Sequence, residues 1–274
     1  MTPAYLIVKL AAAGDVLLTT ALSAALRQAR PGTHIAWLTT GYAAPLLAGN
    51  PDVDEVLLYP EGGRAATAMR MLARLRRWNH VHPQAVVLAG HRSRSLAALL
   101  RIAGVKRLHA LPRGRQFDPS AHRLAWQAGL LAAADIRCDW HRLRPRLELS
   151  AEERAGGERL WHGASRPRWV LACGGGANPW AAMPNRRWPL EGWRILAARA
   201  RAGGISLRWV GGAGEAGEER DNLAGKLGVR QSAAVIAAAD LVIGNDSLPL
   251  VLAQAVRRPG LGLYGPTAGA AIHA

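Results

Sequence analysis

The chain has 274 residues, half of them hydrophobic and a fifth charged, which is typical of a folded globular protein and excludes a disordered one. Its 35 Lys and Arg against 19 Asp and Glu leave a formal net charge of +16. This charge favours anionic partners such as nucleic acid, a phosphorylated glycolipid or a membrane surface, although plain use of Arg on solvated surfaces would produce the same excess.

Short apolar runs alternate with longer helical patterns along the chain. In the first half we expect strands at 5–10, 34–39, 53–59, 85–88 and 106–109, and helices at 16–30, 42–48, 65–78, 93–102 and about 121–134. A segment with Pro and alternating charge at 139–149 is the candidate linker. Beyond it we expect helices at 151–161, 190–202, 215–226, 231–239 and 248–256, and strands at 169–172, 206–210, 241–243 and 260–263. This alternation indicates an α/β protein of two doubly wound parallel sheets, in domains 1–145 and 146–274 that face a cleft.

The cysteine and histidine positions give no sign of a metal site. Cys138 and Cys173 stand far apart, which favours a reducing, cytoplasmic compartment, and no carboxylate or cysteine stands at ligand spacing from His80 and His82. No apolar run approaches the roughly 18 residues of a membrane span, so any membrane contact would be peripheral.

Ligands of doubly wound sheets bind at the carboxyl ends of the strands, where this chain has polar and glycine-rich loops. Asp15 follows Gly14 after the first strand, where it could cap the next helix or carry out the chemistry. Gly174, Gly175 and Gly176 follow a later strand and leave backbone amides available to an anion, or they form a flexible connection. This loop matches neither the P-loop nor the GxGxxG pattern.

Asp246 and Ser247 lie in another such loop, within "LVIGNDSLP". Either side chain could cap the helix that begins there, and the unpaired amides of the helix start could instead hold a phosphate. Capping alone explains both residues, so the pattern leaves their role open.

Four segments of the sequence carry a resemblance to a known family. The opening "LIVKLAAAGDVLLTT…PLLAGNPDVDEVLLYP" has a strand, a G-D turn and an N-P-x-V-D element, and "GGGANPW…NRRWPLEGW", "AAVIAAADLVIGNDSLPLVLAQA" and "LGLYGPT" follow in order. Together they resemble the heptosyltransferases of glycosyltransferase family 9. The resemblance covers nearly the whole chain, and the shared order of four motifs makes it specific.

The resemblance implies a GT-B fold of two Rossmann-like domains and an inverting glycosyltransferase that needs no metal or cofactor. The N-terminal domain would take a lipopolysaccharide core acceptor, a phosphorylated glycolipid, and the C-terminal domain a nucleotide-sugar, typically ADP-heptose. The general base would be Asp15, a role that suits a carboxylate beside an attacking hydroxyl. The acceptor loop would be Ala12, Ala13 and Gly14. The donor would be bound by Gly174, Gly175, Gly176, Arg187, Glu215, Asp246 and Ser247. Of these, Glu215 would bind the ribose of the nucleotide. We expect a cytoplasmic monomer in peripheral contact with the inner face of the inner membrane.

The sequence departs from the family pattern at three positions. Leu248 replaces a glycine and can crowd a diphosphate, Val251 replaces a histidine and cannot donate a hydrogen bond, and Ala13 replaces a serine or threonine. The chain is also shorter than usual after "YGPT". The alternative is therefore a degenerate relative that binds the nucleotide-sugar without transfer. A nucleic-acid-binding protein is a further alternative that rests on charge alone, because the sequence has no recognisable nucleic-acid module.

Overall fold

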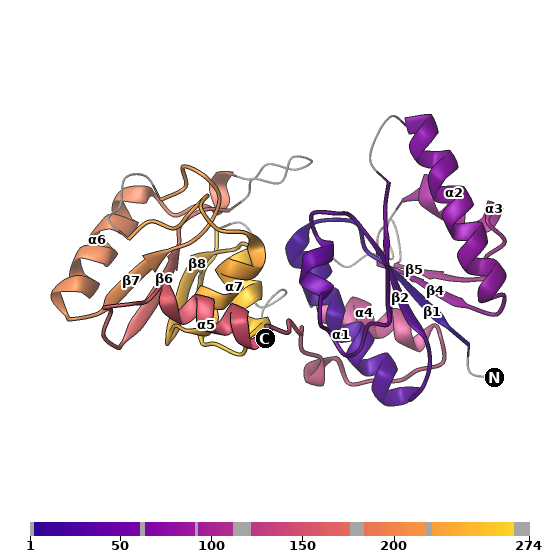
Figure 1. Ribbon diagram of the computed structural model, residues 1–274, viewed down its shortest axis with the longest axis horizontal. Helices are drawn as coiled ribbons and strands as arrows, with labels where there is room; N and C mark the ends of the chain where they lie inside the picture. The colour runs from indigo at the N-terminus through magenta and orange to yellow at the C-terminus, as the bar shows by residue number, and fades with distance from the viewer. Residues whose placement is uncertain are drawn as a thin grey trace. The chain divides into compact units, whose positions relative to one another are not determined.

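The computed structural model describes residues 3–60, 64–90, 93–111, 122–175, 184–216 and 221–265. The chain divides into two compact units, Met1–Arg144 and Pro145–Ala274, each with its own parallel sheet (Figure 1). Among the described residues, no helix combines the length and apolar character that crossing a membrane requires.

The first unit has the strand order of a Rossmann-like sheet. Its strands are β1 (Tyr5–Val8), β2 (Ile35–Thr39), β3 (Glu55–Leu58), β4 (Val86–Ala89) and β5 (Arg107–Ala110), all parallel in the order β3-β2-β1-β4-β5. Its helices are α1 (Ala13–Ala29), α2 (Arg64–Val81), α3 (Arg94–Ile102) and α4 (Arg123–Ala132), with 3-10 turns at Ala44–Leu47 and Trp140–Arg142. The chain runs from β1 out to β3 and then returns to β4 on the other side of β1. The carboxyl ends of β1 and β4 therefore form the switch point where ligands of such sheets bind.

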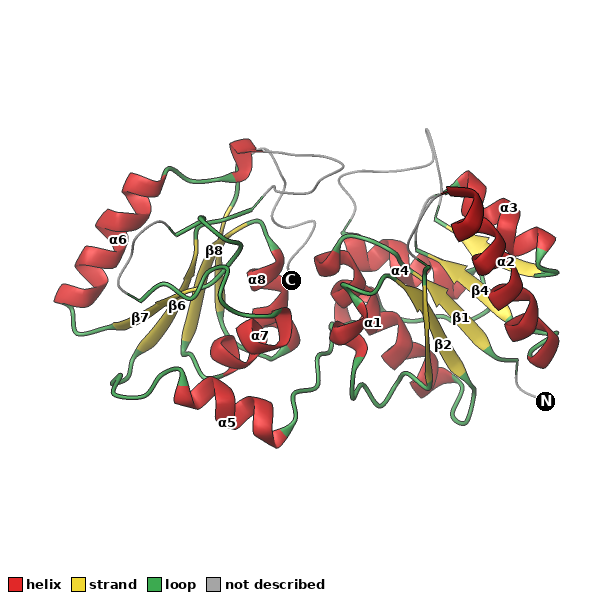
Figure 2. Cartoon of the chain, turned by 45° about the horizontal axis from the view of Figure 1, so that its top comes forward, coloured by secondary structure: helices red, strands yellow, loops and turns green. Residues whose placement is uncertain are grey.

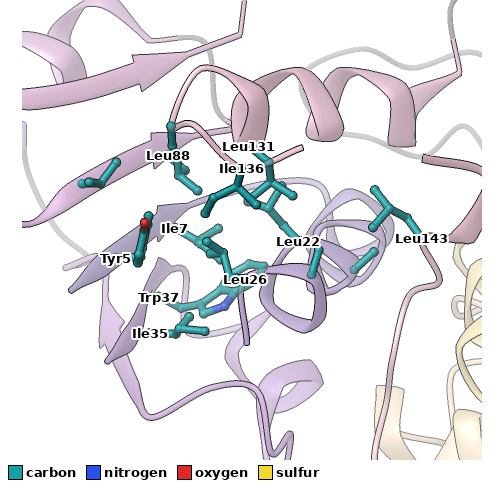
Figure 3. Close-up of a cluster of buried hydrophobic side chains, with 14 of the residues drawn as sticks. Tyr5, Ile7, Leu22, Leu26, Ile35, Trp37, Leu88, Leu131, Ile136 and Leu143 are labelled. Carbon is teal, nitrogen blue, oxygen red and sulfur yellow. The ribbon is translucent and has the colours of Figure 1, made fainter. Parts of the chain in front are cut away.

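Side chains of β1 alternate between two hydrophobic cores, one on each face of the sheet. Tyr5 and Ile7 pack with α1 and α4 on one face (Figure 3). Leu6 and Val8 pack with α2 and α3 on the other face, which these helices cover (Figure 2). Because both faces of the strand are buried, its sequence is a continuous apolar run rather than an alternating one.

The second unit repeats this plan with a different set of helices. Its strands are β6 (Arg168–Ala172), β7 (Ser206–Trp209), β8 (Leu241–Asn245) and β9 (Gly260–Leu263), all parallel in the order β7-β6-β8-β9. Its helices are α5 (Ala151–Arg159), α6 (Leu190–Ala202), α7 (Val229–Ala237) and α8 (Leu248–Ala255), with a 3-10 turn at Pro184–Arg186. Helix α6 packs on one face, and α5, α7 and α8 lie on the other (Figure 2). The switch point lies between the carboxyl ends of β6 and β8.

The helix expected at 215–226 is wrong over its described residues. Residues 221–226 form turns, and Trp209 pairs with Asn222 in an isolated bridge. The Trp209 amide donates to the Asp221 carbonyl oxygen at 3.1 Å, and the Leu223 amide donates to the Trp209 carbonyl oxygen at 2.9 Å. Backbone bonds with the end of β7 thus replace the bonds that a helix would need. The helix expected at 42–48 is the short 3-10 turn Ala44–Leu47.

Helices α5 and α7 pack closely against each other in the second unit. A Cβ atom on Gly157 would lie 2.5 Å from the Ala234 carbonyl carbon and 3.0 Å from its Cβ, so only glycine fits. Arg230 of α7 donates to both carboxylate oxygens of Glu153 and, at 2.6 Å, to the Glu148 carbonyl oxygen. The Arg230 hydrogen bonds outweigh the effect of burial and lower the pKa of Glu153 to about 2.

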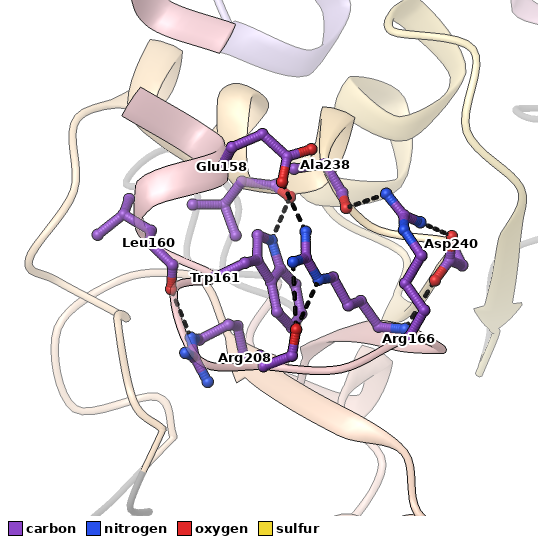
Figure 4. A network of polar contacts seen from close by, with 10 residues as sticks. Glu158, Leu160, Trp161, Arg166, Arg208, Ala238 and Asp240 are labelled. Carbon is purple, nitrogen blue, oxygen red and sulfur yellow. Dashed lines mark hydrogen bonds and ion pairs between the residues drawn. The ribbon is translucent and has the colours of Figure 1, made fainter. Parts of the chain in front are cut away.

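Part of the arginine excess holds the second unit together (Figure 4). The guanidinium groups of Arg168 and Arg208 lie 5.5 Å and 5.1 Å from the ring centre of Trp161. Arg166 pairs with Asp240 just before β8. These arginines have structural partners within the fold, so their charge is no evidence for an anionic ligand.

Candidate functional site

Asp15 lies at the switch point of the first unit, in the first turn of α1. The N-cap of this helix is Ala12, which makes no side-chain capping bond, and Ala13 and Gly14 are the first two helical residues. The carboxylate of Asp15 instead accepts hydrogen bonds from Lys9 and Arg123. Helix capping therefore does not explain why an acidic side chain follows Gly14.

Two cations hold the Asp15 carboxylate. Lys9 Nζ lies 3.2 Å from Oδ2, and Arg123 Nη1, at the start of α4, pairs with Oδ1. Lys9 Nζ also donates to the Gly90 carbonyl oxygen at 3.3 Å, which links the ends of β1 and β4. Burial alone would raise the pKa of Asp15, but the charges and hydrogen bonds of Lys9 and Arg123 hold it below its usual range. Since the side chain is also 28% exposed, Asp15 is an ionised carboxylate within reach of solvent.

A second set of contacts fixes the surroundings of Asp15. The Thr19 hydroxyl donates to the Asp15 carbonyl oxygen at 2.7 Å and accepts from Gln127 Nε2 at 3.3 Å. These bonds tie α1 to α4 and so place Arg123 against the carboxylate. Burial raises the pKa of Tyr42, its hydrogen bond with Thr40 lowers it, and the negative charge of Asp15 raises it further.

Asn245, the last residue of β8, joins the two loops at the switch point of the second unit. Its buried Nδ2 donates to the carbonyl oxygens of Cys173 at 2.6 Å and Gly174 at 3.2 Å. The next residue, Gly175, has φ 140°, which favours glycine. Its carbonyl oxygen accepts a 2.6 Å hydrogen bond from Arg187 Nε. The glycine turn is thus anchored on both sides by side-chain hydrogen bonds.

Glu215 lies against this glycine turn. Its Oε2 accepts from the Gly212 amide at 2.7 Å, and Cys173 Sγ donates to its carbonyl oxygen at 2.9 Å. A Cβ atom on Gly174 or Gly211 would overlap the Glu215 carboxylate. A side chain at either position would therefore displace this carboxylate, which occupies the space between the loops after β6 and β7.

Asp246 and Ser247 follow Asn245 at the start of α8. Asp246 is buried and pairs with Arg186, not Arg187, with Nη1 3.3 Å from Oδ2. Ser247 is the N-cap of α8, but its hydroxyl donates to the Asn245 carbonyl oxygen at 3.0 Å and makes no capping bond. The amino end of α8 is therefore not closed by its N-cap side chain, and capping does not explain Ser247.

Two of the positions at which the sequence departs from the family pattern lie in α8, and their surroundings differ. Leu248, the first helical residue, is partly exposed, whereas Val251 is buried at 5% exposure. The position of the family histidine therefore belongs to the packed core in this chain. Nearby, burial and the negative charge of Asp246 raise the pKa of Tyr264 to about 12, so its hydroxyl remains protonated.

The structure places all of the predicted site residues except Gly176 at the two switch points. Ala12, Ala13, Gly14 and Asp15 share the first, and Gly174, Gly175, Arg187, Glu215, Asp246 and Ser247 share the second. Gly176 lies outside the described residues.

Three residues of these sites were missed by sequence reasoning. Asn245 ends β8 directly before the predicted Asp246, and Lys9 follows β1 three residues before the predicted Ala12, so their positions at strand ends could have identified both. Arg123 is 108 residues from Asp15, and no local pattern marks it as a partner.

Solved structures with the same fold include a glycosyltransferase of family 9 from Veillonella parvula, which is 21% identical with a TM-score of 0.82 over 97% of this chain and 81% of that one. The E. coli ADP-heptose lipopolysaccharide heptosyltransferase II is 22% identical, with a TM-score of 0.76 over 97% of this chain and 86% of that one. An E. coli heptosyltransferase with ADP-2-deoxy-2-fluoro heptose is 19% identical, with a TM-score of 0.61 over 96% and 89% of the two chains. No curated protein sequence matches the chain significantly.

These likenesses show that the two parallel sheets form a GT-B-like heptosyltransferase fold. The family model described as glycosyltransferase family 9 (heptosyltransferase) matches residues 118–273, more than half of the chain. The chain therefore belongs to glycosyltransferase family 9, the heptosyltransferase family.

Proposed function

We propose that this chain transfers a heptose, or a related sugar, from a nucleotide-sugar to a hydroxyl of a lipopolysaccharide core acceptor, with inversion and without metal or cofactor. The observation that carries the proposal is the ionised Asp15 carboxylate, partly exposed at the carboxyl end of β1 between Lys9 and Arg123. A relative of the same fold is an ADP-heptose heptosyltransferase, and another was solved with an ADP-heptose analogue, which supports ADP-heptose as the donor. In this proposal domain 1–145 takes the acceptor and domain 146–274 takes the donor.

Asp15 acts as the general base. It takes the proton of the acceptor hydroxyl while that oxygen attacks the anomeric carbon, and the bond from this carbon to the diphosphate oxygen breaks as the nucleotide leaves. A carboxylate with a lowered pKa is a weak base as long as its cations stay in place. An anionic group of the acceptor that draws Lys9 or Arg123 away raises the pKa of Asp15. The base is then strongest when the acceptor is bound.

A basic cavity in the first unit suits an anionic acceptor. Its volume is about 540 Å³, and Arg70, Arg74 and Arg77 of α2 line it together with Tyr59 and Gly41. The spacing of the three arginines places them on one face of the helix. The cavity lies at the carboxyl ends of β2 and β3, the same edge of the parallel sheet as Asp15. Guanidinium groups there can pair with phosphates or carboxylates of a core glycolipid.

The donor contacts that we propose lie at the switch point of the second unit. The glycine turn after β6 lets the nucleotide approach the backbone, and Glu215 accepts hydrogen bonds from the ribose hydroxyls. The departing diphosphate needs positive charge, which the amino end of α8 at Ser247 and the Arg187 guanidinium supply. Asp246, held by its ion pair, positions this helix start.

An Asp15→Ala variant tests the assigned base. Transfer from ADP-heptose should be abolished, while the affinity for ADP by calorimetry stays nearly unchanged because the donor contacts lie on the other unit. Asp139→Asn is the control: this aspartate caps the 3-10 turn Trp140–Arg142, and asparagine can cap it equally well. If the Asp15→Ala variant still transfers the sugar, Asp15 is not the general base. NMR of the product tests inversion, and an unchanged anomeric configuration would exclude it.

A relative that binds the nucleotide-sugar without transferring it is the second candidate. The partly exposed Leu248 side chain at the start of α8 can crowd a diphosphate, and the buried Val251 side chain has no hydrogen-bond donor, so both favour this candidate. Calorimetry with ADP-heptose beside a transfer assay on the unmodified chain decides between the two. Binding without product selects the second candidate, and product selects the first.

A further inference from the structure

A separate cluster of polar side chains lies at the amino end of the first sheet, opposite the edge that holds Asp15. His34 immediately precedes β2, Glu55 is the first residue of β3, and His82 follows α2. Their ligand atoms lie within 4.8 Å of one another, and all three residues are partly exposed. Over the described ranges, no other group of His, Cys, Asp or Glu brings three such atoms together.

Direct contacts hold the three side chains in this arrangement. His34 Nε2 lies 3.1 Å from Glu55 Oε2, and the indole Nε1 of Trp78 donates to the same oxygen at 3.2 Å. The His82 ring stacks on His34 with ring centres 4.8 Å apart, and it lies 4.9 Å from the Trp78 ring. The two imidazoles and the carboxylate therefore converge on one small volume.

The backbone at each position is also anchored. The Tyr5 amide donates to the His34 carbonyl oxygen at 2.8 Å, and Glu55 is in register with Ala36 in the sheet. The His82 amide donates to a carbonyl oxygen of α2 at 3.0 Å, and its own carbonyl oxygen accepts from Ala85 at 3.0 Å. Ligands on anchored backbone lose little freedom when they bind an ion.

We propose that His34, Glu55 and His82 form a binding site for a divalent transition-metal ion such as Zn²⁺. Two imidazoles and one carboxylate suit zinc and leave a fourth position for water. With metal–ligand bonds of about 2.0–2.1 Å at tetrahedral angles, donor atoms lie roughly 3.3 Å apart. The 3.1 Å between His34 Nε2 and Glu55 Oε2 is close to this, and the His82 ring has to rotate out of its stack on His34 to bring a nitrogen to the same ion. Trp78 supports the carboxylate from outside the ligand set, as metal-bound carboxylates require.

The ion would join β2, β3 and the end of α2, three elements that are separate in the sequence. Its effect is to stabilise the first unit, because the site lies at the opposite edge of the sheet from Asp15. A plain ion pair between His34 and Glu55 beside stacked rings would also hold these contacts. That explanation predicts no response to metal ions, so the two explanations can be separated by measurement.

The test uses the full chain without an affinity tag, freed of metal by a chelator, with Zn²⁺ as the calorimetric probe and Co²⁺ as the spectroscopic one. We expect one Zn²⁺ per chain, a rise in Tm on binding, and the visible absorption of low-coordinate Co²⁺. His34→Ala and His82→Gln should lose this binding, and Trp78→Phe should weaken it about 10-fold. His80→Ala is the control, because His80 is an exposed histidine of α2, two residues before His82 and outside the cluster.

Three results would overturn the proposal: no saturable Zn²⁺ binding, binding that persists in both His34→Ala and His82→Gln, or an equal loss in His80→Ala. Far-UV circular dichroism and the Tm of each variant without metal show whether it folds. If His34→Ala is unfolded, His82→Gln, which keeps much of the side-chain volume, decides the question. Transfer activity should not depend on this site, so the metal-site proposal and the proposed function can each fail without the other.

Discussion

Substitution of Gly174 by alanine should displace Glu215. A Cβ atom at this position overlaps the Glu215 carboxylate, and ordinary contacts between carbon and oxygen are about 3.3 Å or longer. The φ angle of Gly174 is not in the left-handed region, so alanine adds no backbone strain. The flexible carboxylate therefore has to move, and the hydrogen bond from the Gly212 amide at 2.7 Å is lost.

The size of the effect follows from that bond. A hydrogen bond to a charged group contributes roughly 1.5–3 kcal/mol, and each 1.4 kcal/mol is about tenfold in an equilibrium constant. If Glu215 binds the ribose from this position, Gly174→Ala should weaken ADP binding by about 10- to 100-fold. Glu215→Ala should cause a similar loss.

Calorimetry with ADP on both single variants and on the double variant tests the reasoning. Once Glu215 is alanine, the Cβ atom on residue 174 has no carboxylate to displace, so the double variant should bind ADP as Glu215→Ala does. Gly203→Ala is the control, because a Cβ atom there meets only ordinary contacts at 3.5 Å. Losses that add in the double variant would refute the displacement mechanism, and unchanged ADP affinity in Glu215→Ala would refute the ribose contact.

Three further changes have defined outcomes. Gly157→Ala should lower the free energy of unfolding by about 1–3 kcal/mol, because the added methyl group keeps α5 from approaching α7. Gly156→Ala, where a Cβ atom has room, should not destabilise the protein, and urea denaturation of the two variants tests the difference. The pKa of Glu153 is lowered to about 2, so its contribution to the stability of the fold is complete above its ordinary pKa of 4.5 and is lost as the pH falls towards 2. The loss, roughly 1–2 kcal/mol after screening, should be seen in acid titrations followed by circular dichroism and should be absent in Glu153→Gln. Arg123→Gln removes one of the charges that hold the pKa of Asp15 down, so this pKa should rise, as carboxyl-carbon NMR titration can measure, and the acid limb of the transfer profile should move to higher pH.

Local patterns account well for the elements and for the loops that carry the predicted residues. Where the chain forms hydrogen bonds with distant segments, local patterns fail. The helix expected at 215–226 does not form over 221–226, because Asp221 and Leu223 of this segment bond to Trp209 and the segment lies beside β7 instead. A sequence window cannot show this competition, because the competing partner is in another strand.

The sequence by itself determined the two doubly wound sheets, because hydrophobic period and turn residues are local properties that act within a few residues. It also placed Asp15 and Glu215 at strand ends. Only the tertiary structure decided what surrounds them: Arg123 reaches Asp15 from 108 residues away, and the Glu215 carboxylate packs against Gly174 of another loop. Such contacts depend on how separate elements pack, and packing is a property of the whole fold that no local pattern encodes.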